Sequence, residues 1–115
     1  RVAAGCAAAN GASVVCRYER RYPPTINHVG PTQIAVGVAR EIVGDANVDL
    51  DPTPTMGGED FAFMLEQKPG CYAFIGNGPS EDGRALHSPH YDFNDEILPI
   101  GASYLVRLAE TVLPA

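Results

Sequence analysis

The spacing of apolar residues predicts helices in three parts of the chain. In each part, apolar side chains recur every three or four residues, which places them on one face of a helix. These stretches are the stripe of Ile34, Val38 and Ile42, residues 59–67, and the stripe of Leu105, Leu108 and Val112. A fourth helix is predicted over residues 1–10, which are rich in alanine and end at Asn10-Gly11, a common C-terminal pair.

Strands are predicted where the helical spacing is absent. Residues 12–22 alternate between two sets of side chains and contain β-branched and aromatic residues, as in a strand with one face in water. Residues 71–75 are a continuous apolar run between glycines, which is typical of a strand buried on both faces. Residues 47–51 alternate but contain three strand-disfavouring acidic or amide residues. Helices that alternate with strands predict an α/β fold.

A break in the pattern divides the chain into two units. Pro23-Pro24 cannot donate hydrogen bonds to a sheet. The residues from there to Gly30 show no periodicity, and Pro31 then suits the first position of a helix. We therefore expect residues 1–22 to belong to a different structural unit from residues 30–115, with a hinge between them.

Charge and cysteine content narrow the classes of partner. The 8 basic and 14 acidic side chains give a formal net charge of −6, which disfavours nucleic acid and anionic membranes as partners. Cys6, Cys16 and Cys71 are widely spaced and form no CxxC motif, so we expect reduced thiols. With no signal-peptide core near Arg1, the cytoplasm is the expected compartment.

Two loops carry residues suited to chemistry. Gly57 and Gly58 precede a predicted helix start, where free backbone N–H groups can hold a carboxylate. The alternative is an ordinary glycine loop in which Glu59 and Asp60 offset the helix dipole. Residues 86–95 contain two of the three histidines and two aspartates, the side chains that bind divalent metals.

The same second loop also has an ordinary structural interpretation. His90 is then an exposed loop residue, and Asn94 or Asp95 caps the last helix. His28 has the same ordinary interpretation. A serine hydrolase is disfavoured because no G-x-S-x-G motif occurs. A Cys–His pair is disfavoured because the apolar run around Cys71 predicts a buried, inert thiol.

Four segments together resemble the C-terminal part of the M20 metallopeptidase family, in its amidohydrolase branch of hippurate hydrolases, N-acyl-amino-acid deacylases and auxin-conjugate hydrolases. Their order and spacing follow the family pattern along nearly the whole chain. They are Tyr22-Pro-Pro-Thr-Ile-Asn27, Met56-Gly-Gly-Glu-Asp-Phe61, Leu86-His-Ser-Pro-His-Tyr-Asp-Phe-Asn-Asp95 and Leu98-Pro-Ile-Gly-Ala102.

The resemblance implies a two-domain enzyme with a catalytic α/β domain and an inserted lid domain that commonly mediates homodimerisation. Residues 1–22 are then the last helix and strand of the lid, residues 23–29 the hinge, and residues 30–115 the C-terminal portion of the catalytic domain. The family's H-x-C-G-H-D segment and paired glutamates, one of them the general base, are missing from this chain. The chain is therefore expected to be a C-terminal fragment that is inactive alone.

The resemblance also assigns roles to individual residues. It implies that His87, not His90, binds one of two divalent metal ions, Zn or Mn, and that Gly57 and Gly58 line the substrate side, with Asn27 contributing from the hinge. No general base is expected within the chain. The implied reaction is cleavage of the amide bond of an N-acyl amino acid by metal-activated water. The alternative is a non-catalytic α/β module that binds small carboxylates through residues 57–60.

Overall fold

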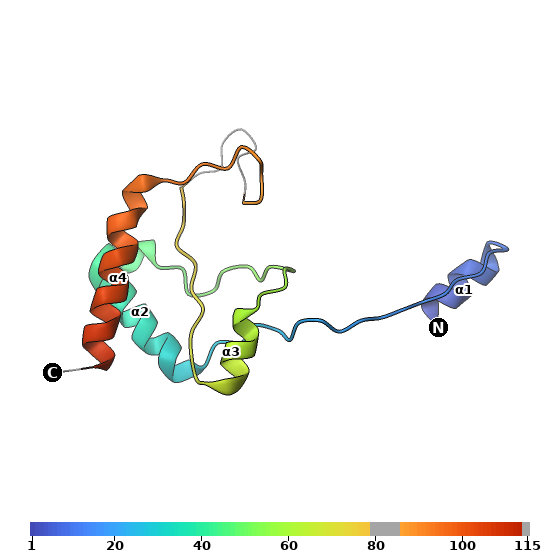
Figure 1. Cartoon of the computed structure of the whole chain (residues 1–115), viewed down its shortest axis with the longest axis horizontal. Helices are drawn as coiled ribbons and strands as arrows, with labels where there is room; N and C mark the ends of the chain where they lie inside the picture. Colours follow the sequence, from blue (N-terminus) through green and yellow to red (C-terminus); the bar gives the residue numbers. More distant parts are fainter. Residues whose placement is uncertain (79–85, 114–115) are drawn as a thin grey trace.

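A computed structural model describes residues 1–78 and 86–113 of the chain (Figure 1). Its elements, in order, are α1 (Val2–Ala9), α2 (Val29–Val43), the 3-10 turn η1 (Asp45–Asn47), α3 (Phe61–Gln67), the 3-10 turn η3 (Asp95–Ile97) and α4 (Leu98–Val112). The four predicted helices are confirmed. No strand occurs among the described residues, so the predicted α/β fold is wrong for this structure.

The predicted strands are extended segments without a partner. A β-strand is defined by hydrogen bonds to a neighbouring strand, and an alternating sequence alone cannot provide them. Residues 12–22 form an isolated arm that leads away to α1 (Figure 1). Residues 71–75 are also extended and unpaired as a strand, and residues 47–51 follow the η1 turn without strand pairing. The last strand expected for residues 1–22 is therefore absent.

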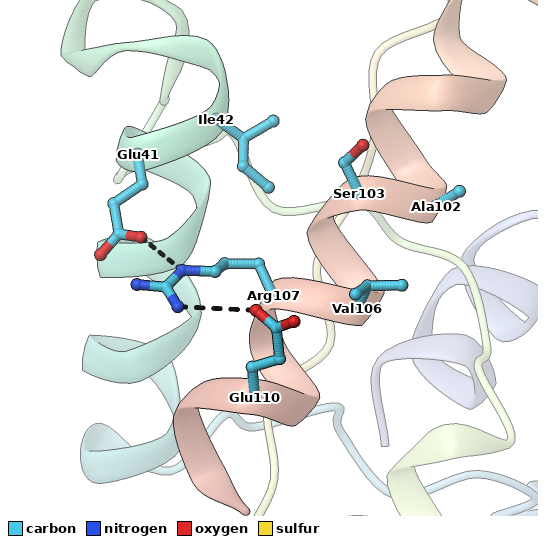
Figure 2. Close-up of a pocket in the computed structure, with 7 residues that line it drawn as sticks. All are labelled: Glu41, Ile42, Ala102, Ser103, Val106, Arg107 and Glu110. Atoms are coloured by element: carbon cyan, nitrogen blue, oxygen red, sulfur yellow. Dashed lines mark hydrogen bonds and ion pairs between the residues drawn. The ribbon is translucent and has the colours of Figure 1, made fainter. Parts of the chain in front are cut away.

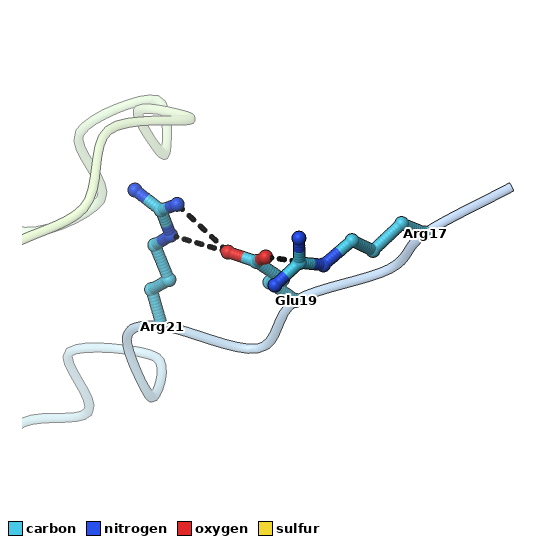
Figure 3. Close-up of polar contacts among 3 residues, drawn as sticks. All are labelled: Arg17, Glu19 and Arg21. Carbon is cyan, nitrogen blue, oxygen red and sulfur yellow. Dashed lines mark hydrogen bonds and ion pairs between the residues drawn. The ribbon is translucent and has the colours of Figure 1, made fainter.

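Charged side chains along the arm show that its backbone is extended. Arg17, Glu19 and Arg21 occur at alternate positions, and Figure 3 shows Glu19 between the two arginines. Its carboxylate lies 2.7 Å from each guanidinium group. Side chains two residues apart meet in this way on extended backbone. The single wet face predicted for residues 12–22 is wrong, because all of these residues are exposed. The three side chains are solvent-exposed, so the ion pairs contribute little to stability.

The small core forms where α2 packs on α4 and where α3 folds back. Ala35 and Val38 of α2 are buried, and so are Ala62 and Leu65 of α3. Val38, with 2% of its surface exposed, lies on the stripe that the sequence predicted for this helix. An ion pair between Arg107 and Glu41, at 2.8 Å, joins α2 to α4.

The apolar stripe predicted for α4 faces the rest of the chain only at Leu108. Leu105 is exposed, whereas Gly101, Tyr104 and Leu108 are half-buried on the side toward the rest of the chain. A Cβ added at Gly101 would lie 3.4 Å from the Ile75 side chain, so α4 packs close to the extended segment there. Because α4 is apolar on more than one side, its pattern did not determine which side faces the chain.

The molecule is elongated. Its radius of gyration is 20.1 Å and its extents are 67 × 38 × 23 Å, compared with about 13 Å for a compact domain of about 100 residues. The arm and α1 extend away from the helices that carry the core (Figure 1). Across residues 1–78 and 86–113, no helix combines the length and apolarity needed to cross a bilayer.

Candidate functional site

The loop before α3 is held by its own glutamate. Oε1 of Glu59 accepts a hydrogen bond from the Phe61 backbone N–H at 3.1 Å. Its Oε2 accepts a second from the Tyr72 hydroxyl at 2.9 Å. The Phe61 N–H, followed by the Tyr72 hydroxyl, holds the pKa of Glu59 below its ordinary value. The negative charge at the start of α3 is therefore supplied by the chain itself.

Tyr72 connects this loop to the extended segment that follows α3. Its ring lies 5.4 Å from the Phe61 ring and 5.2 Å from the Phe74 ring, measured between centroids. The hydrogen bond to the Glu59 carboxylate, with some desolvation, raises the pKa of Tyr72 above its ordinary value. Tyr72 is therefore a neutral donor at neutral pH and holds the carboxylate in place.

Asn27 uses its whole carboxamide on the backbone of Tyr72. The Asn27 amide nitrogen donates to the Tyr72 carbonyl at 2.8 Å, and its oxygen accepts from the Tyr72 N–H at 2.7 Å. The neighbouring His28 donates its backbone N–H to the Gly70 carbonyl at 3.0 Å. Its ring Nδ1 accepts from the Gly70 N–H at 3.2 Å. Residues 27 and 28 are thus bound side by side to residues 70–72.

The two predicted glycines have different surroundings. A Cβ added at Gly57 would meet nothing within 4 Å among the described atoms. At Gly58 the same atom would lie 3.1 Å from the Tyr22 ring, which also approaches the Phe63 ring with centroids 5.7 Å apart. Gly57 therefore leaves the loop backbone open on one side, while Gly58 lets Tyr22 approach it closely.

His87 lies in a separate loop with an unusual backbone conformation. Its φ of 70° is positive, which is uncommon for a residue with a side chain. The imidazole is exposed. Immediately after it, the Ser88 hydroxyl accepts from the His90 N–H at 3.2 Å, and the Ser88 carbonyl accepts from the Tyr91 N–H at 3.0 Å. His90 is also exposed, as expected for a loop residue.

A second asparagine attaches this loop to the extended segment. The Asn77 amide nitrogen donates to the Asp92 carbonyl at 2.9 Å, and the Asn77 oxygen accepts from the Asn94 N–H at 2.8 Å. The Asn94 side chain then caps η3 by accepting from the Glu96 N–H at 3.0 Å. The capping role predicted for Asn94 is confirmed, although the cap serves the 3-10 turn that precedes α4.

The structure brings some of the predicted site residues together and leaves others apart. Asn27 and the 57–59 loop are joined through Tyr72. Residues 86–94, the orange loop that contains His87, lie at the far end of segment 70–78 from α3 (Figure 1). The glycine loop and the histidine loop are therefore attached to opposite ends of the same extended segment.

The described residues do not form a metal site by themselves. Within residues 1–78 and 86–113, no three His, Cys, Asp or Glu side chains are grouped so that they could hold a metal ion. A protein zinc site uses three or four such ligands. The exposed imidazole of His87 has the right donor chemistry for one position. The other ligands would have to come from outside the described part of this chain.

A shallow depression of about 500 Å³ between α2 and α4 is not this site (Figure 2). It is lined by Glu41, Ile42, Ala102, Ser103, Val106, Arg107 and Glu110. Arg107 bridges Glu41 at 2.8 Å and Glu110 at 3.6 Å. One arginine therefore faces two glutamates, so the lining of the depression keeps an excess of negative charge, and it contains neither imidazole nor thiol.

The pairing of Glu59 with Tyr72 and the bracing role of Asn77 were missed by sequence analysis. An acidic residue two positions before α3 gave a signal for the helix cap, and it was interpreted only as an offset to the dipole. Tyr72 lies within an apolar run, so nothing in its position indicated that the hydroxyl has a partner. Polar contacts between residues distant in sequence have no local signature.

Comparisons with known proteins place this arrangement in a family. Residues 8–111 match Peptidase family M20/M25/M40. The Bacillus subtilis protein YhaA, an amidohydrolase by name, is 35% identical over 96% of the chain and 28% of its own length. The hippurate hydrolase of Campylobacter jejuni is 35% identical over 95% of the chain and 28% of its own length. IAA-amino acid hydrolase ILR1-like 6 of Arabidopsis thaliana is 37% identical over 80% of the chain and 20% of its own length.

These matches define how much of such a protein is present. The chain spans about a quarter of the length of the curated relatives it matches. No solved structure matches the chain. Because the family match includes nearly all of the sequence, from α1 to the end of α4, the chain belongs to peptidase family M20/M25/M40.

Proposed function

We propose that the protein containing this chain hydrolyses the amide bond of N-acyl amino acids. The observation that carries the proposal is the 35% identity to a hippurate hydrolase over 95% of the chain. A relative named IAA-amino acid hydrolase matches over 80% of the chain, and it too is named for an amide-linked amino acid. Amide hydrolysis of a small conjugate is the reaction class that these names share.

The proposed reaction uses divalent metal ions, and His87 is the residue of this chain that would bind one of them. The metal would activate a water molecule as the nucleophile. His87 supports this role because its imidazole is exposed on a loop that Asn77 braces. The general base and the other ligands are proposed to lie in the part of the protein outside this chain.

Gly57, Gly58 and Asn27 are proposed to serve the substrate side. The open backbone at Gly57 leaves room for a ligand on one side of the loop. Asn27 has both ends of its carboxamide engaged by Tyr72, which favours a supporting role over direct contact with substrate. Residues 1–22 are proposed to end a lid domain that dimerises, and residues 23–29 to form the hinge to the catalytic portion.

The proposed compartment is the cytoplasm. The three cysteines are free, and two of them are exposed. Exposed free thiols persist where the environment is reducing.

The test is hydrolysis by the purified gene product that contains this sequence, loaded with Zn or Mn. Hippurate and a panel of N-acetyl amino acids are the substrates, and amino-acid release is the readout. We expect turnover of at least one N-acyl amino acid and no turnover by residues 1–115 alone, because a single imidazole cannot close a metal site. Absence of turnover on the whole panel would overturn the proposal. The non-catalytic module would then be favoured if small carboxylates still bound.

A further inference from the structure

Three segments that are distant in sequence converge on one phenol. They are residues 22–28, the glycine loop 57–61 and the start of the extended segment, residues 70–72. Residues 22–28 consist of Tyr22 and most of the hinge proposed over residues 23–29, and they are called the hinge segment below. Each of the three is joined to another by hydrogen bonds or ring contacts. Tyr72 takes part with its backbone toward the hinge and with its hydroxyl toward the loop.

On the hinge side of this junction, hydrogen bonds join residues 27 and 28 to residues 70–72. Asn27 forms two hydrogen bonds with the Tyr72 backbone, at 2.7 and 2.8 Å. The His28 backbone and ring form two more with Gly70. A carboxamide that donates and accepts with one residue reproduces the pairing of two strands at a single position. A displacement of residues 27–28 would therefore carry Tyr72 with it.

On the loop side of the junction, two hydrogen bonds hold the Glu59 carboxylate. The two oxygens of Glu59 have different partners, the Tyr72 hydroxyl and the Phe61 N–H. Hydrogen bonds to an ionised carboxylate are about twice as strong as neutral ones. Glu59 directly follows Gly58, and Gly58 itself packs against Tyr22, the first residue of the hinge segment. The loop thus contacts the hinge segment directly at Gly58 and is joined to it through Tyr72 at Glu59.

We propose that Tyr72 and Glu59 are positioning residues of the substrate site, which couple the hinge segment 22–28 to the Gly57-Gly58 loop. The inference rests on the proposed function, because the loop is there assigned to the substrate side. Movement of the hinge is transmitted through Asn27, Tyr72 and Glu59 to the backbone of the loop. Substrate affinity therefore depends on the Tyr72 hydroxyl, even though that hydroxyl is engaged by Glu59 and does not contact the reacting atoms.

The kinetic test compares Tyr72→Phe with Tyr18→Phe in the gene product that contains this sequence. Tyr18 is a matched control because it is 82% exposed on the arm. We expect Tyr72→Phe to raise KM by about tenfold, the scale of one lost charge-assisted hydrogen bond. Its kcat should change by less than about twofold and its metal content should not change. The Tyr18→Phe variant should match the wild type in all three.

A spectroscopic test needs no turnover. Phenolate absorbance is followed as pH rises, and the Tyr72 contribution is isolated by subtracting the Tyr72→Phe curve. Glu59→Gln should move the Tyr72 titration to lower pH, because the neutral amide no longer favours the protonated phenol. Glu59→Gln should also raise KM while leaving metal content unchanged.

The outcomes separate this inference from the proposed function. Equal KM values for Tyr72→Phe and Tyr18→Phe in an active enzyme would overturn the inference and leave the proposed function standing. An unchanged Tyr72 titration in Glu59→Gln would overturn it without reference to activity. A wild-type protein that hydrolyses no N-acyl amino acid would defeat the proposed function, and the assignment of Tyr72 to a substrate site with it.

Discussion

Two asparagine side chains hold the extended segment in place by hydrogen bonds, as a neighbouring strand would do in a sheet. Asn27 holds one end of the extended segment by the backbone of Tyr72. Asn77 holds the other end by Asp92 and Asn94. Each carboxamide donates and accepts at once, so two residues fix a segment that has no ladder of its own. The segment therefore connects the glycine loop to the histidine loop as a braced unit.

The two loop histidines should differ in metal binding. In the gene product that contains this sequence, His87→Ala should lower metal occupancy by at least about tenfold, the scale on which losses around a metal site are felt. His90→Ala is the matched control, because it removes the same ring from the same exposed loop. It should leave metal content close to that of the wild type. Metal analysis of both purified variants would refute the assignment if only His90→Ala emptied the site.

The hydrogen bonds of Glu59 predict a pH dependence of stability. Because the folded pKa of Glu59 lies below its ordinary value of 4.5, the carboxylate stabilises the fold above that value. This contribution is lost as pH falls through the lower, folded pKa. Denaturation midpoints should therefore fall less between about pH 5 and about pH 2 in Glu59→Gln than in the wild type. An equal fall in the denaturation midpoints of the two proteins over this pH range would contradict this account of Glu59.

The hydrogen bond of Tyr72 predicts how stability changes at alkaline pH. Its folded pKa lies above the ordinary value of 10.0, so the phenol stabilises the fold below that value. The contribution is lost as pH rises through the raised, folded pKa. The loop is therefore held by both groups across the range between the two titrations.

Helix packing at the element scale rests on few side chains. Val38 of α2 lies in the small core and is nearly fully buried, with 2% of its surface exposed. Val38→Ala should lower the free energy of unfolding of the chain by about 2 kcal/mol, from the lost transfer of two methyl groups and the cavity they leave. Val106 of α4 lines the depression between the two helices but is 59% exposed, so Val106→Ala should cost less than about 0.5 kcal/mol. Urea titrations followed by circular dichroism would contradict this packing if the two variants were equally destabilised.

The elements could be predicted from the sequence to different degrees. Helices depend on hydrogen bonds within one segment, so the spacing of Ile34, Val38 and Ile42 was sufficient to locate α2. Strands depend on a partner, and residues 12–22 and 71–75 have the right side chains but no neighbouring strand in the described structure. The spacing of apolar residues in α4 likewise did not determine which side faces the rest of the chain, because that side depends on the segments that pack against the helix.

The candidate site could also be predicted only in part, because local motifs were visible in the sequence and contacts between distant residues were not. Motif spacing identified the glycine loop and the histidine loop, and the structure shows how each is braced. The Glu59–Tyr72 hydrogen bond spans residues that are unrelated in local sequence, so no periodicity indicated it. Contacts of this kind are determined by the packing of the whole chain.

Exposed apolar surface dominates at the scale of the whole molecule. Four apolar side chains are buried among the residues that the structure describes. The radius of gyration is 20.1 Å, well above the roughly 13 Å of a compact domain of about 100 residues. Large hydrophobic side chains such as Val15, at 97% exposure, and Met56 face solvent. Apolar patches of this kind are covered by other protein surfaces in stable assemblies.

Residues 1–115 alone should therefore self-associate. The arm and most of segment 70–78 have no strand partner in the described structure, so they offer strand edges. The exposed side chains add an apolar driving force. Light scattering should show a mass above that of the monomer, increasing with concentration. A monomer with a radius of gyration near about 13 Å at high concentration would show that the chain closes its own core, contrary to this account.

The most direct test of the central claim is hippurate hydrolysis by the metal-loaded gene product that contains this sequence, measured beside its His87→Ala variant. The account predicts release of glycine by the wild type and a rate at least about tenfold lower in the variant, because one bond to the metal is lost. His90→Ala, measured in parallel, should keep a rate close to that of the wild type. Hydrolysis by the His87→Ala variant at the wild-type rate would contradict the claim that this chain contributes a metal ligand to an amidohydrolase.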